Sequence, residues 1–171
     1  EVVTSLGSVY FNDKNFKKAR DVYALITDSE KRDINYYKAL LLTGKCYFSE
    51  EDWSSAAQIF EEVWQRAKLA AVKDEAFSLM IQSRIMVAKA LYDGGEYGKA
   101  ALAYTEIEDH FPENEYGDIV LFNGAEAYDK MGKWIRASHT YEQLVEKYPQ
   151  SKFAPDALFN AAGNYEKKER W

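Results

Sequence analysis

The chain is poor in the residues that build several common kinds of site. It has one cysteine, Cys46, among 171 residues, which excludes an internal disulfide and a cysteine metal cluster. Its two histidines, His110 and His139, have no acidic or cysteine partner at ligand spacing. No glycine-rich phosphate loop and no nucleophile motif is present. We therefore predict no metal site, no cofactor and no enzyme activity.

Long basic runs and long apolar runs are also missing. No run of Lys and Arg exceeds two residues, and the net charge is −6, whereas nucleic-acid binding normally needs a basic face. No stretch approaches the roughly 18 consecutive apolar residues of a membrane helix. We thus predict no nucleic-acid partner and no direct membrane insertion. No signal peptide is visible, but the chain begins with Glu1 and not methionine, so we expect a fragment whose native N-terminus is missing.

Proline and glycine are scarce, while aromatic residues are plentiful. There are three prolines and nine glycines against thirteen tyrosines and four tryptophans, and 47% of residues are hydrophobic. Such a composition excludes disorder and suits a helical globular protein.

Most of the aromatic residues belong to an internal repeat. Its clearest copy is a cassette of Trp134, Ala137, Tyr141 and Leu144, followed by Pro149. The same spacing recurs at Tyr97, Ala100, Tyr104 and Ile107, at Trp53, Ala56, Phe60 and Val63, and at Phe16, Ala19, Tyr23 and Ile26. The offsets of 37, 44 and 37 residues indicate one structural unit repeated in tandem. Trp171 would open a fifth cassette, so we expect the native chain to continue.

The spacing within a cassette is helical and places its members on one face, which we predict to be buried. The alanine allows a close approach between two helices, and the aromatic residues fill the gaps on either side. We predict that both aromatic positions are core. These positions are Phe16, Trp53, Tyr97 and Trp134, then Tyr23, Phe60, Tyr104 and Tyr141.

The 44-residue interval implies seven extra residues in the second repeat, about two helical turns. No glycine or proline occurs between residues 53 and 93, so the turn is hard to place. We predict it in Ala71–Asp74, with Asp74 capping a helix that runs from Glu75 to Asp93. The extension near Arg66–Glu75 either forms a protruding corner that docks a partner or widens one packing step, and we favour the second.

The links between cassettes define the repeats. Asp52, Asn114 and Ser151 stand where a helix N-cap is expected. We predict an all-α, right-handed superhelical solenoid of antiparallel helix hairpins, four hairpins plus one unpaired C-terminal helix. The repeats are 1–33, 34–74, 75–115, 116–153 and a first helix over 154–171.

The cassettes resemble the tetratricopeptide repeat, whose pattern sets a small residue before an aromatic residue, then an alanine, an aromatic residue and a proline. The resemblance covers essentially the whole chain, although the period is 37 residues and Leu91 replaces one aromatic residue. The matching positions are Ser8, Phe11 or Tyr10, Ala19 and Tyr23; Gly44, Tyr47, Ala56 and Phe60; Ala88, Ala100, Tyr104 and Pro112; and Ala125, Tyr128, Ala137, Tyr141 and Pro149.

The resemblance implies a non-catalytic scaffold, part of a multiprotein assembly, that binds a protein or peptide segment in a groove lined by the first helix of each hairpin. The residues so placed are Phe11, Lys38, Leu41, Lys45, Phe48, Ile85, Lys89, Tyr92, Phe122, Glu126 and Phe159. Phe122 and Phe159 could instead pack against neighbouring first helices, and the lysines could simply be solvated. Thr4 and Ser8, then Leu41 and Lys45, do not form the family's carboxylate clamp, so we predict no chaperone-tail adaptor.

An alternative function is a structural spacer or oligomerisation module whose groove is empty. The unpaired fifth helix could then mediate a homodimer. The links after Pro112 and Pro149 resemble those of tetratricopeptide adaptors of the bacterial cell envelope, such as outer-membrane assembly lipoproteins and Tol-associated periplasmic coordinators. This resemblance predicts a periplasmic or envelope location, with the cytoplasm as the alternative.

Overall fold

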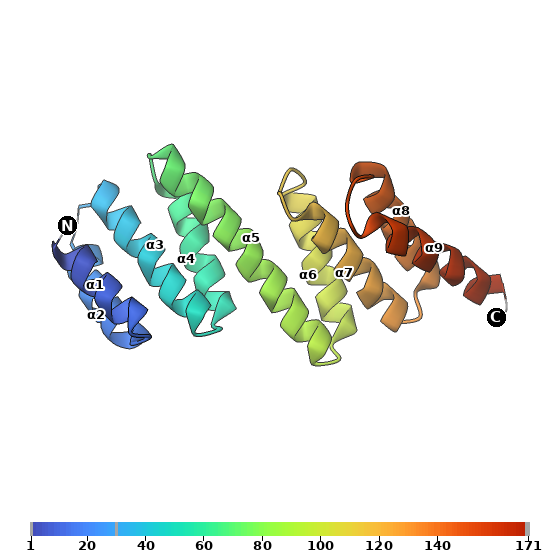
Figure 1. The fold of residues 1–171 in the computed structure, drawn as a ribbon, viewed down its shortest axis with the longest axis horizontal. Coiled ribbons are helices and arrows are strands. Elements are labelled where there is room, and N and C mark those ends of the chain that lie inside the picture. The colour runs from blue at the N-terminus through green and yellow to red at the C-terminus, as the bar shows by residue number, and fades with distance from the viewer. Residues whose placement is uncertain (1, 30, 170–171) are drawn as a thin grey trace. The chain divides into compact units, whose positions relative to one another are not determined.

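The computed structural model describes residues 2–29 and 31–169, and every regular element within them is an α-helix (Figure 1). This confirms the all-α class. The chain divides into two compact units, unit 1 over residues 1–84 and unit 2 over residues 85–171. Helix α5 continues through the boundary. Trp171, the expected start of a fifth cassette, lies outside the described residues.

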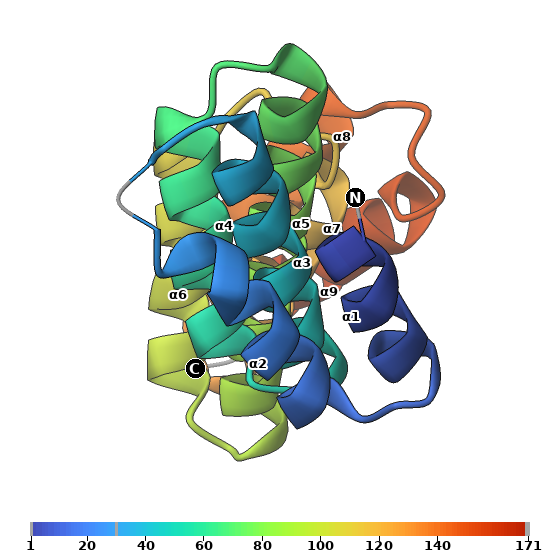
Figure 2. The same ribbon diagram turned by 90° about the vertical axis from the view of Figure 1, so that its left-hand side faces the viewer.

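Unit 1 begins with two helix hairpins. It contains α1 (Val2–Asn12), α2 (Phe16–Thr27), α3 (Ile34–Ser49), α4 (Trp53–Arg66) and the first part of α5 (Ala70–Asp93). Helices α1 and α2 lie side by side (Figure 2), and α2 then packs on α3. Ala19 and Tyr23 of α2 form a buried cluster with Ala39 and Cys46 of α3. The cassette of one hairpin is therefore covered by the first helix of the next.

Unit 2 repeats this arrangement. It contains the last part of α5, then α6 (Tyr97–His110), α7 (Gly117–Lys130), α8 (Trp134–Lys147) and α9 (Ala154–Glu169). Its buried cluster joins the cassette of α8 to small or aliphatic residues of α7 and α9. The members of that cluster are Leu121, Ala125, Ala137, Tyr141, Leu144, Ala154, Ala157 and Ala161.

The two aromatic positions of each cassette differ in burial. The second aromatic residues, Tyr23, Phe60, Tyr104 and Tyr141, are at most 2% exposed, which confirms the prediction for them. The opening aromatic residues are only half-buried, so their assignment to the core is confirmed only in part: Phe16 packs against the buried cluster of unit 1. They stand in the first turn of a second helix, where the packing partner covers one side of the ring. Phe16, Trp53, Tyr97 and Trp134 form this second group.

The turn predicted at Ala71–Asp74 is wrong. Helix α4 ends at Arg66, Ala67 adopts an extended conformation with ψ 143°, and α5 begins at Ala70. Asp74 therefore lies inside a helix and caps nothing. The extra residues lengthen the start of α5, which has 24 residues against 16 in α3 and 14 in α7.

Of the helix N-caps predicted at Asp52, Asn114 and Ser151, only the one at Asp52 is confirmed. The side chain of Asp52 accepts a hydrogen bond from the Ser55 N–H and caps α4 as predicted. Asn114 and Ser151 are not N-caps. Their side chains accept hydrogen bonds from backbone N–H groups two residues on, at Tyr116 and Phe153, and so order the links before α7 and α9.

Candidate partner-binding surfaces

In unit 1, the predicted groove residues divide between the surface and the interior. Lys38 is exposed, and Lys45 is half-buried with its Nζ 2.5 Å from a carboxylate oxygen of Glu75. Leu41 is only 5% exposed, so its side chain belongs to the core and is not accessible to a partner. The ring of Phe11 packs edge-on against Phe16 at 5.3 Å and closes the first hairpin. Phe48 is half-buried.

In unit 2, the first-helix residues also have different roles. Ile85 is 9% exposed and serves the interior, while Lys89 pairs with Asp93 on its own helix. Phe122 packs against Tyr141 of α8 and stacks on Phe153 of the following link, with ring centroids 5.6 and 5.0 Å apart. Of the two phenylalanines that could have packed internally, Phe122 does so.

The other phenylalanine of that pair remains at the surface. Phe159 of α9 is 79% exposed, and its neighbour Leu158 is 59% exposed. These two side chains are the counterparts, 37 residues on, of Leu121 and Phe122, which are covered by α8 and the link that follows it. The exposed side of α9 thus carries two adjacent apolar side chains.

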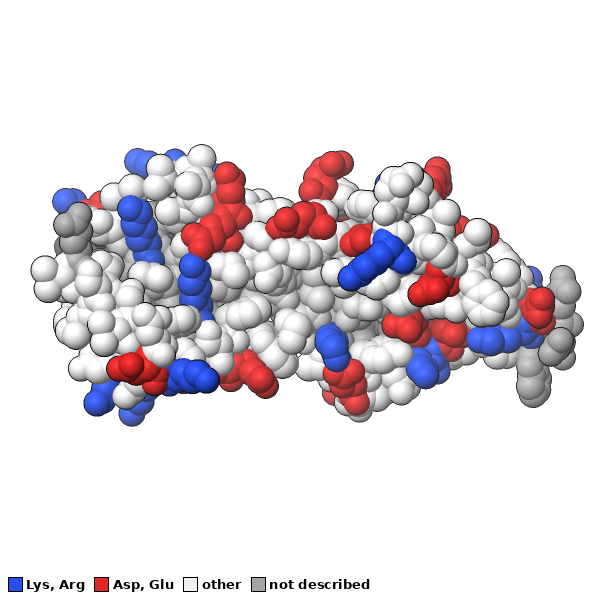
Figure 3. All heavy atoms as spheres, in the orientation of Figure 1, with Lys and Arg blue, Asp and Glu red and all other residues white. Residues whose placement is uncertain are grey.

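One surface on the first helices of unit 2 combines acidic and aromatic side chains. We call it the first-helix face of unit 2 and define it by Tyr92, Glu126, Asp129 and Lys167. Figure 3 shows acidic side chains gathered near the C-terminal end of α7. Asp129 is paired with Lys167 of α9 at 3.0 Å, whereas Glu126 forms no ion pair with any described residue. The carboxylate of Glu126 is therefore free to receive a cation.

The charge of Glu126 influences the pKa of three tyrosines of unit 2, Tyr92, Tyr104 and Tyr141. Burial raises the pKa of Glu126 above its ordinary value, opposed by the charge of Lys130. Burial also raises the pKa of Tyr104 to about 12 and raises the pKa of Tyr92 and Tyr141, and the charge of Glu126 adds to all three shifts. The phenol groups thus stay neutral near pH 7. The half-buried Tyr92 can act as a hydrogen-bond donor or as a ring surface for a cation, whereas Tyr104 and Tyr141 are too buried to contact a partner.

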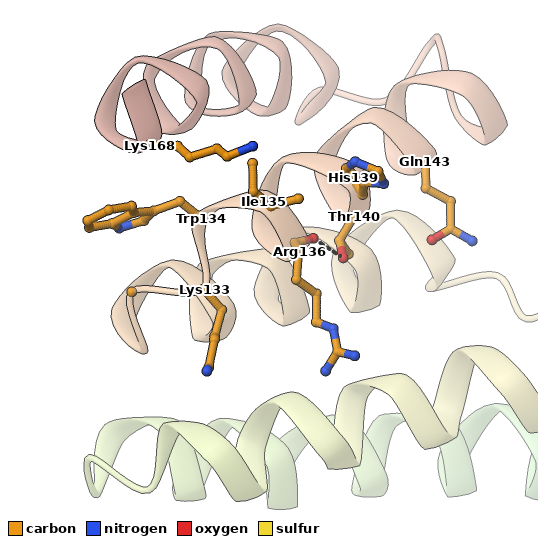
Figure 4. Close-up of a pocket in the computed structure, with 9 residues that line it drawn as sticks. Lys133, Trp134, Ile135, Arg136, His139, Thr140, Gln143 and Lys168 are labelled. Atoms are coloured by element: carbon orange, nitrogen blue, oxygen red, sulfur yellow. Dashed lines mark hydrogen bonds between the residues drawn. The ribbon is translucent and has the colours of Figure 1, made fainter. Parts of the chain in front are cut away.

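A pocket of about 660 Å³, not foreseen from the sequence, lies along α8 (Figure 4). Trp134, Ile135 and His139 line it, and Lys168 of α9 reaches over it. Trp134, which the cassette pattern assigns to the core, is half-buried and lines this pocket.

The side chains that could carry chemistry are dispersed. Among residues 2–29 and 31–169, no group of three His, Cys, Asp or Glu residues could hold a metal ion. Burial raises the pKa of Cys46 to about 11, so the thiol is protonated near pH 7 and unreactive. No helix in the described part of the chain is both long enough and apolar enough to cross a membrane.

Comparison with known proteins agrees with this architecture. The model of the tetratricopeptide repeat family matches residues 38–68 and 120–151. Each matched segment covers most of one hairpin, α3 with α4 and α7 with α8. No curated protein is matched by sequence.

Solved structures resemble the whole chain. MamA of AMB-1 is 15% identical, with a TM-score of 0.51 over 99% of this chain and 82% of that one. Two structures of a Podosopora anserina kinesin light chain with nearly identical TPR-like repeats are also 15% identical, with TM-scores of 0.48 and 0.47 over 99% of this chain and 86% of theirs. The fold is that of a tetratricopeptide repeat array, a scaffold that is generally non-catalytic and binds proteins or peptides.

Proposed function

We propose that the chain is a non-catalytic scaffold within a multiprotein assembly, and that the first-helix face of unit 2 binds a partner segment carrying a basic side chain. The observation that carries this proposal is Glu126, a half-buried carboxylate without an ion pair among the described residues. A charge in such a position is costly unless it is paired, and an incoming guanidinium or ammonium group would pair it.

The surroundings of Glu126 favour a cation over a neutral group. Asp129 lies one helical turn away on α7, and its charge acts on Glu126. Tyr92 is half-buried and packs edge-on against Tyr97 at 5.2 Å, so its position is fixed. A basic side chain would contact the carboxylate and the face of a tyrosine ring together.

The test uses a fluorescent peptide with one arginine between leucines, and the same peptide with neutral citrulline at that place. We expect the arginine peptide to bind about tenfold more tightly in fluorescence anisotropy, because a charge-assisted hydrogen bond is lost in the second. Glu126→Gln should remove the difference, whereas Glu146→Gln on the exposed side of α8 should preserve it. Equal affinity of the wild type for both peptides would contradict the proposal.

A second candidate function is self-association through α9. The observation that favours it is the exposed pair Leu158 and Phe159, since contiguous exposed apolar residues mark interaction surfaces. In sedimentation velocity we expect a dimer that Phe159→Ser dissociates. Leu102→Ser is the control, because Leu102 of α6 is also an exposed apolar residue, at 59% against 79% for Phe159. A wild-type monomer at high concentration would exclude this function.

The location proposed for the protein is the periplasm or cell envelope of a bacterium. What supports it is the 37-residue period and the repeated link after Pro112 and Pro149. Fractionation of cells that express the full-length gene, followed by immunoblotting, tests this location. Recovery of the protein only in the cytoplasmic fraction would exclude it.

A further inference from the structure

Unit 1 has a pocket at one edge that the first-helix face does not include. It has a volume of about 530 Å³, within the range of small-ligand and peptide side-chain pockets. We call it the edge pocket. Its walls come from the link before α3, the first turn of α3, the link after α4 and the start of α5. The lining residues are Arg32, Asp33, Ile34, Tyr37, Ala67, Lys68, Leu69 and Val72.

The additional turns of α5 help to build this pocket. At the 44-residue offset the counterpart of Ile34, the first residue of α3, is Ser78, yet α5 begins about two turns earlier at Ala70. Val72 and Ala76 in these turns are buried at 6% and 0% exposure and belong to the interior of unit 1. Leu69 stands just before them and is 41% exposed. The added residues therefore contribute two buried side chains, Val72 and Ala76, and leave Leu69 partly exposed at the surface.

The floor of the edge pocket is apolar, and its rim is exposed. Tyr37, Ala67 and Val72 are each no more than 8% exposed and form a preorganised base. Ile34, at 47% exposure, and Leu69 present aliphatic side chains to solvent at the rim. A large apolar side chain from a partner would cover both and remove them from water.

The charge at the rim is predominantly positive. Neither Arg32 nor Lys68 forms an ion pair with a described residue. Arg32 lies over the ring of Tyr36 at 4.0 Å and donates hydrogen bonds to two backbone carbonyls, so its guanidinium is held in place. The one carboxylate of the pocket, Asp33, accepts hydrogen bonds from the N–H groups of Asn35 and Tyr36 and is committed to capping α3.

The corresponding place in unit 2 shows that these properties are not general to the repeat. There the pocket between successive links has a volume of about 410 Å³ and is lined by two acidic side chains, Glu115 and Asp118, against one lysine, Lys147, together with Tyr148, Pro149, Gln150 and Ser151. Asp118 accepts a hydrogen bond from the Ser151 hydroxyl at 2.6 Å across it. The apolar floor with a basic rim is therefore particular to the edge pocket of unit 1.

We propose that the edge pocket is a second binding site, which takes a large apolar side chain flanked by carboxylates in an acidic segment of a partner protein. The apolar group fills the space between Ile34 and Leu69, and the carboxylates meet Arg32 and Lys68. The opposite charge preference distinguishes this site from the first-helix face of unit 2. The two sites can therefore hold different parts of one partner or two different partners.

The probes for this site are three labelled peptides measured by fluorescence anisotropy: phenylalanine between two pairs of glutamates, alanine in place of the phenylalanine, and lysines in place of the glutamates. We expect the first peptide to bind at least about tenfold more tightly than the other two, because burial of one aromatic side chain and a charge-assisted pair each contribute that much. Equal binding of all three peptides, or no binding of the first, would overturn the proposal.

Two variants in exposed links locate the binding. Lys68→Glu and Leu69→Gln should each weaken the acidic phenylalanine peptide about tenfold, while Lys133→Glu, which makes the same charge change beside the α8 pocket, should leave the affinity unchanged. Amide shifts of the wild type in nuclear magnetic resonance titrations provide a readout that needs no variant. Shifts centred on residues 32–37 and 67–72 support the site, and shifts confined to unit 2 exclude it.

Discussion

Single residues control how closely helices approach in this array. A Cβ atom placed on Gly44 of α3 would lie 2.6 Å from Cε1 of Phe60, whose side chain is fully buried. We predict that Gly44→Ala destabilises the protein by about 1–3 kcal/mol through overpacking. Gly163 of α9 is the matched control, because a Cβ there meets nothing within 4 Å. Gly163→Ala should stabilise by up to about 1 kcal/mol, since alanine favours helix. Urea unfolding measures the change in the free energy of unfolding for both variants. Changes of equal size and the same sign would contradict the packing argument.

The carboxyl group of Glu126 links stability to pH. Burial raises its pKa above the ordinary value of 4.5, so the folded state keeps this proton to a higher pH than the unfolded chain does. Between the two pKa values the folded state binds more protons, and the free energy of unfolding falls as pH rises. We predict that Glu126→Gln is more stable than the wild type above this window and equal to it below pH 4.5.

Thermal unfolding of the wild type, Glu126→Gln and Glu146→Gln across this pH range measures the effect. Only Glu126→Gln should gain stability over the wild type, and this gain should grow with pH. The same substitution should remove the preference for the arginine peptide over the citrulline peptide, so a gain in stability would accompany a loss of binding specificity. A constant difference from the wild type at all pH values would show that the carboxylate is not the cause.

At the scale of helices, the register of the cassette decides where a second helix ends. Lys68 lies 15 residues after Trp53, the same interval that separates Pro112 from Tyr97 and Pro149 from Trp134. The chain turns at this place whether or not proline is present. The cause is that the buried face of α4 ends there: Val63 is its last buried residue, and residues 64–66 are half-buried or exposed.

This register makes a proline exchange informative. We predict that Lys68→Pro stabilises by about 0.4–1 kcal/mol, because Ala67 is already extended and the Lys68 N–H donates to no backbone carbonyl in the described part of the chain. Lys73→Pro should cost about 3 kcal/mol or more, because the Lys73 N–H bonds to the Leu69 carbonyl inside α5. Urea denaturation compares the two, and tolerance of proline at both positions would contradict the observed helix boundary.

The same register shows what could be predicted from the sequence. Helix boundaries at Phe16, Trp53, Tyr97 and Trp134 follow from the repeat, because each cassette must bury the same face. The turn after α4 has no glycine or proline to mark it, and only the interval of 15 residues from Trp53 locates it.

The candidate sites were harder to predict, for a physical reason. The groove residues transferred by position included Leu41 and Ile85, which the structure buries, because such a transfer ignores how the neighbouring helix covers each turn. The edge pocket brings together Ile34 at the start of α3 and Leu69 in the link after α4, which lie far apart in sequence. No local sequence pattern contains that arrangement, whereas the position of Glu126 on a first helix follows from the repeat.

For the whole molecule, the division into two units predicts how stability is distributed. The cluster around Tyr23 and Cys46 belongs to unit 1, and the cluster around Tyr141 and Leu144 belongs to unit 2. In repeat arrays, stability is approximately a sum over repeats and their nearest-neighbour contacts. Loss of a core side chain in one unit should therefore loosen that unit first.

Leu144 and Val63 occupy the same cassette position in the two units, and each is 0% exposed. We predict that Leu144→Ala, which costs about 2–5 kcal/mol, speeds amide exchange in α7, α8 and α9 by at least about tenfold and leaves α1 and α2 unchanged. Val63→Ala should give the reciprocal result. Amide exchange should be faster in α3 and α4 and unchanged in α8 and α9. Hydrogen exchange followed by mass spectrometry resolves these segments. A uniform increase along the chain in either variant would mean that the array unfolds as one cooperative body, and additivity between repeats would then be the wrong description of its stability.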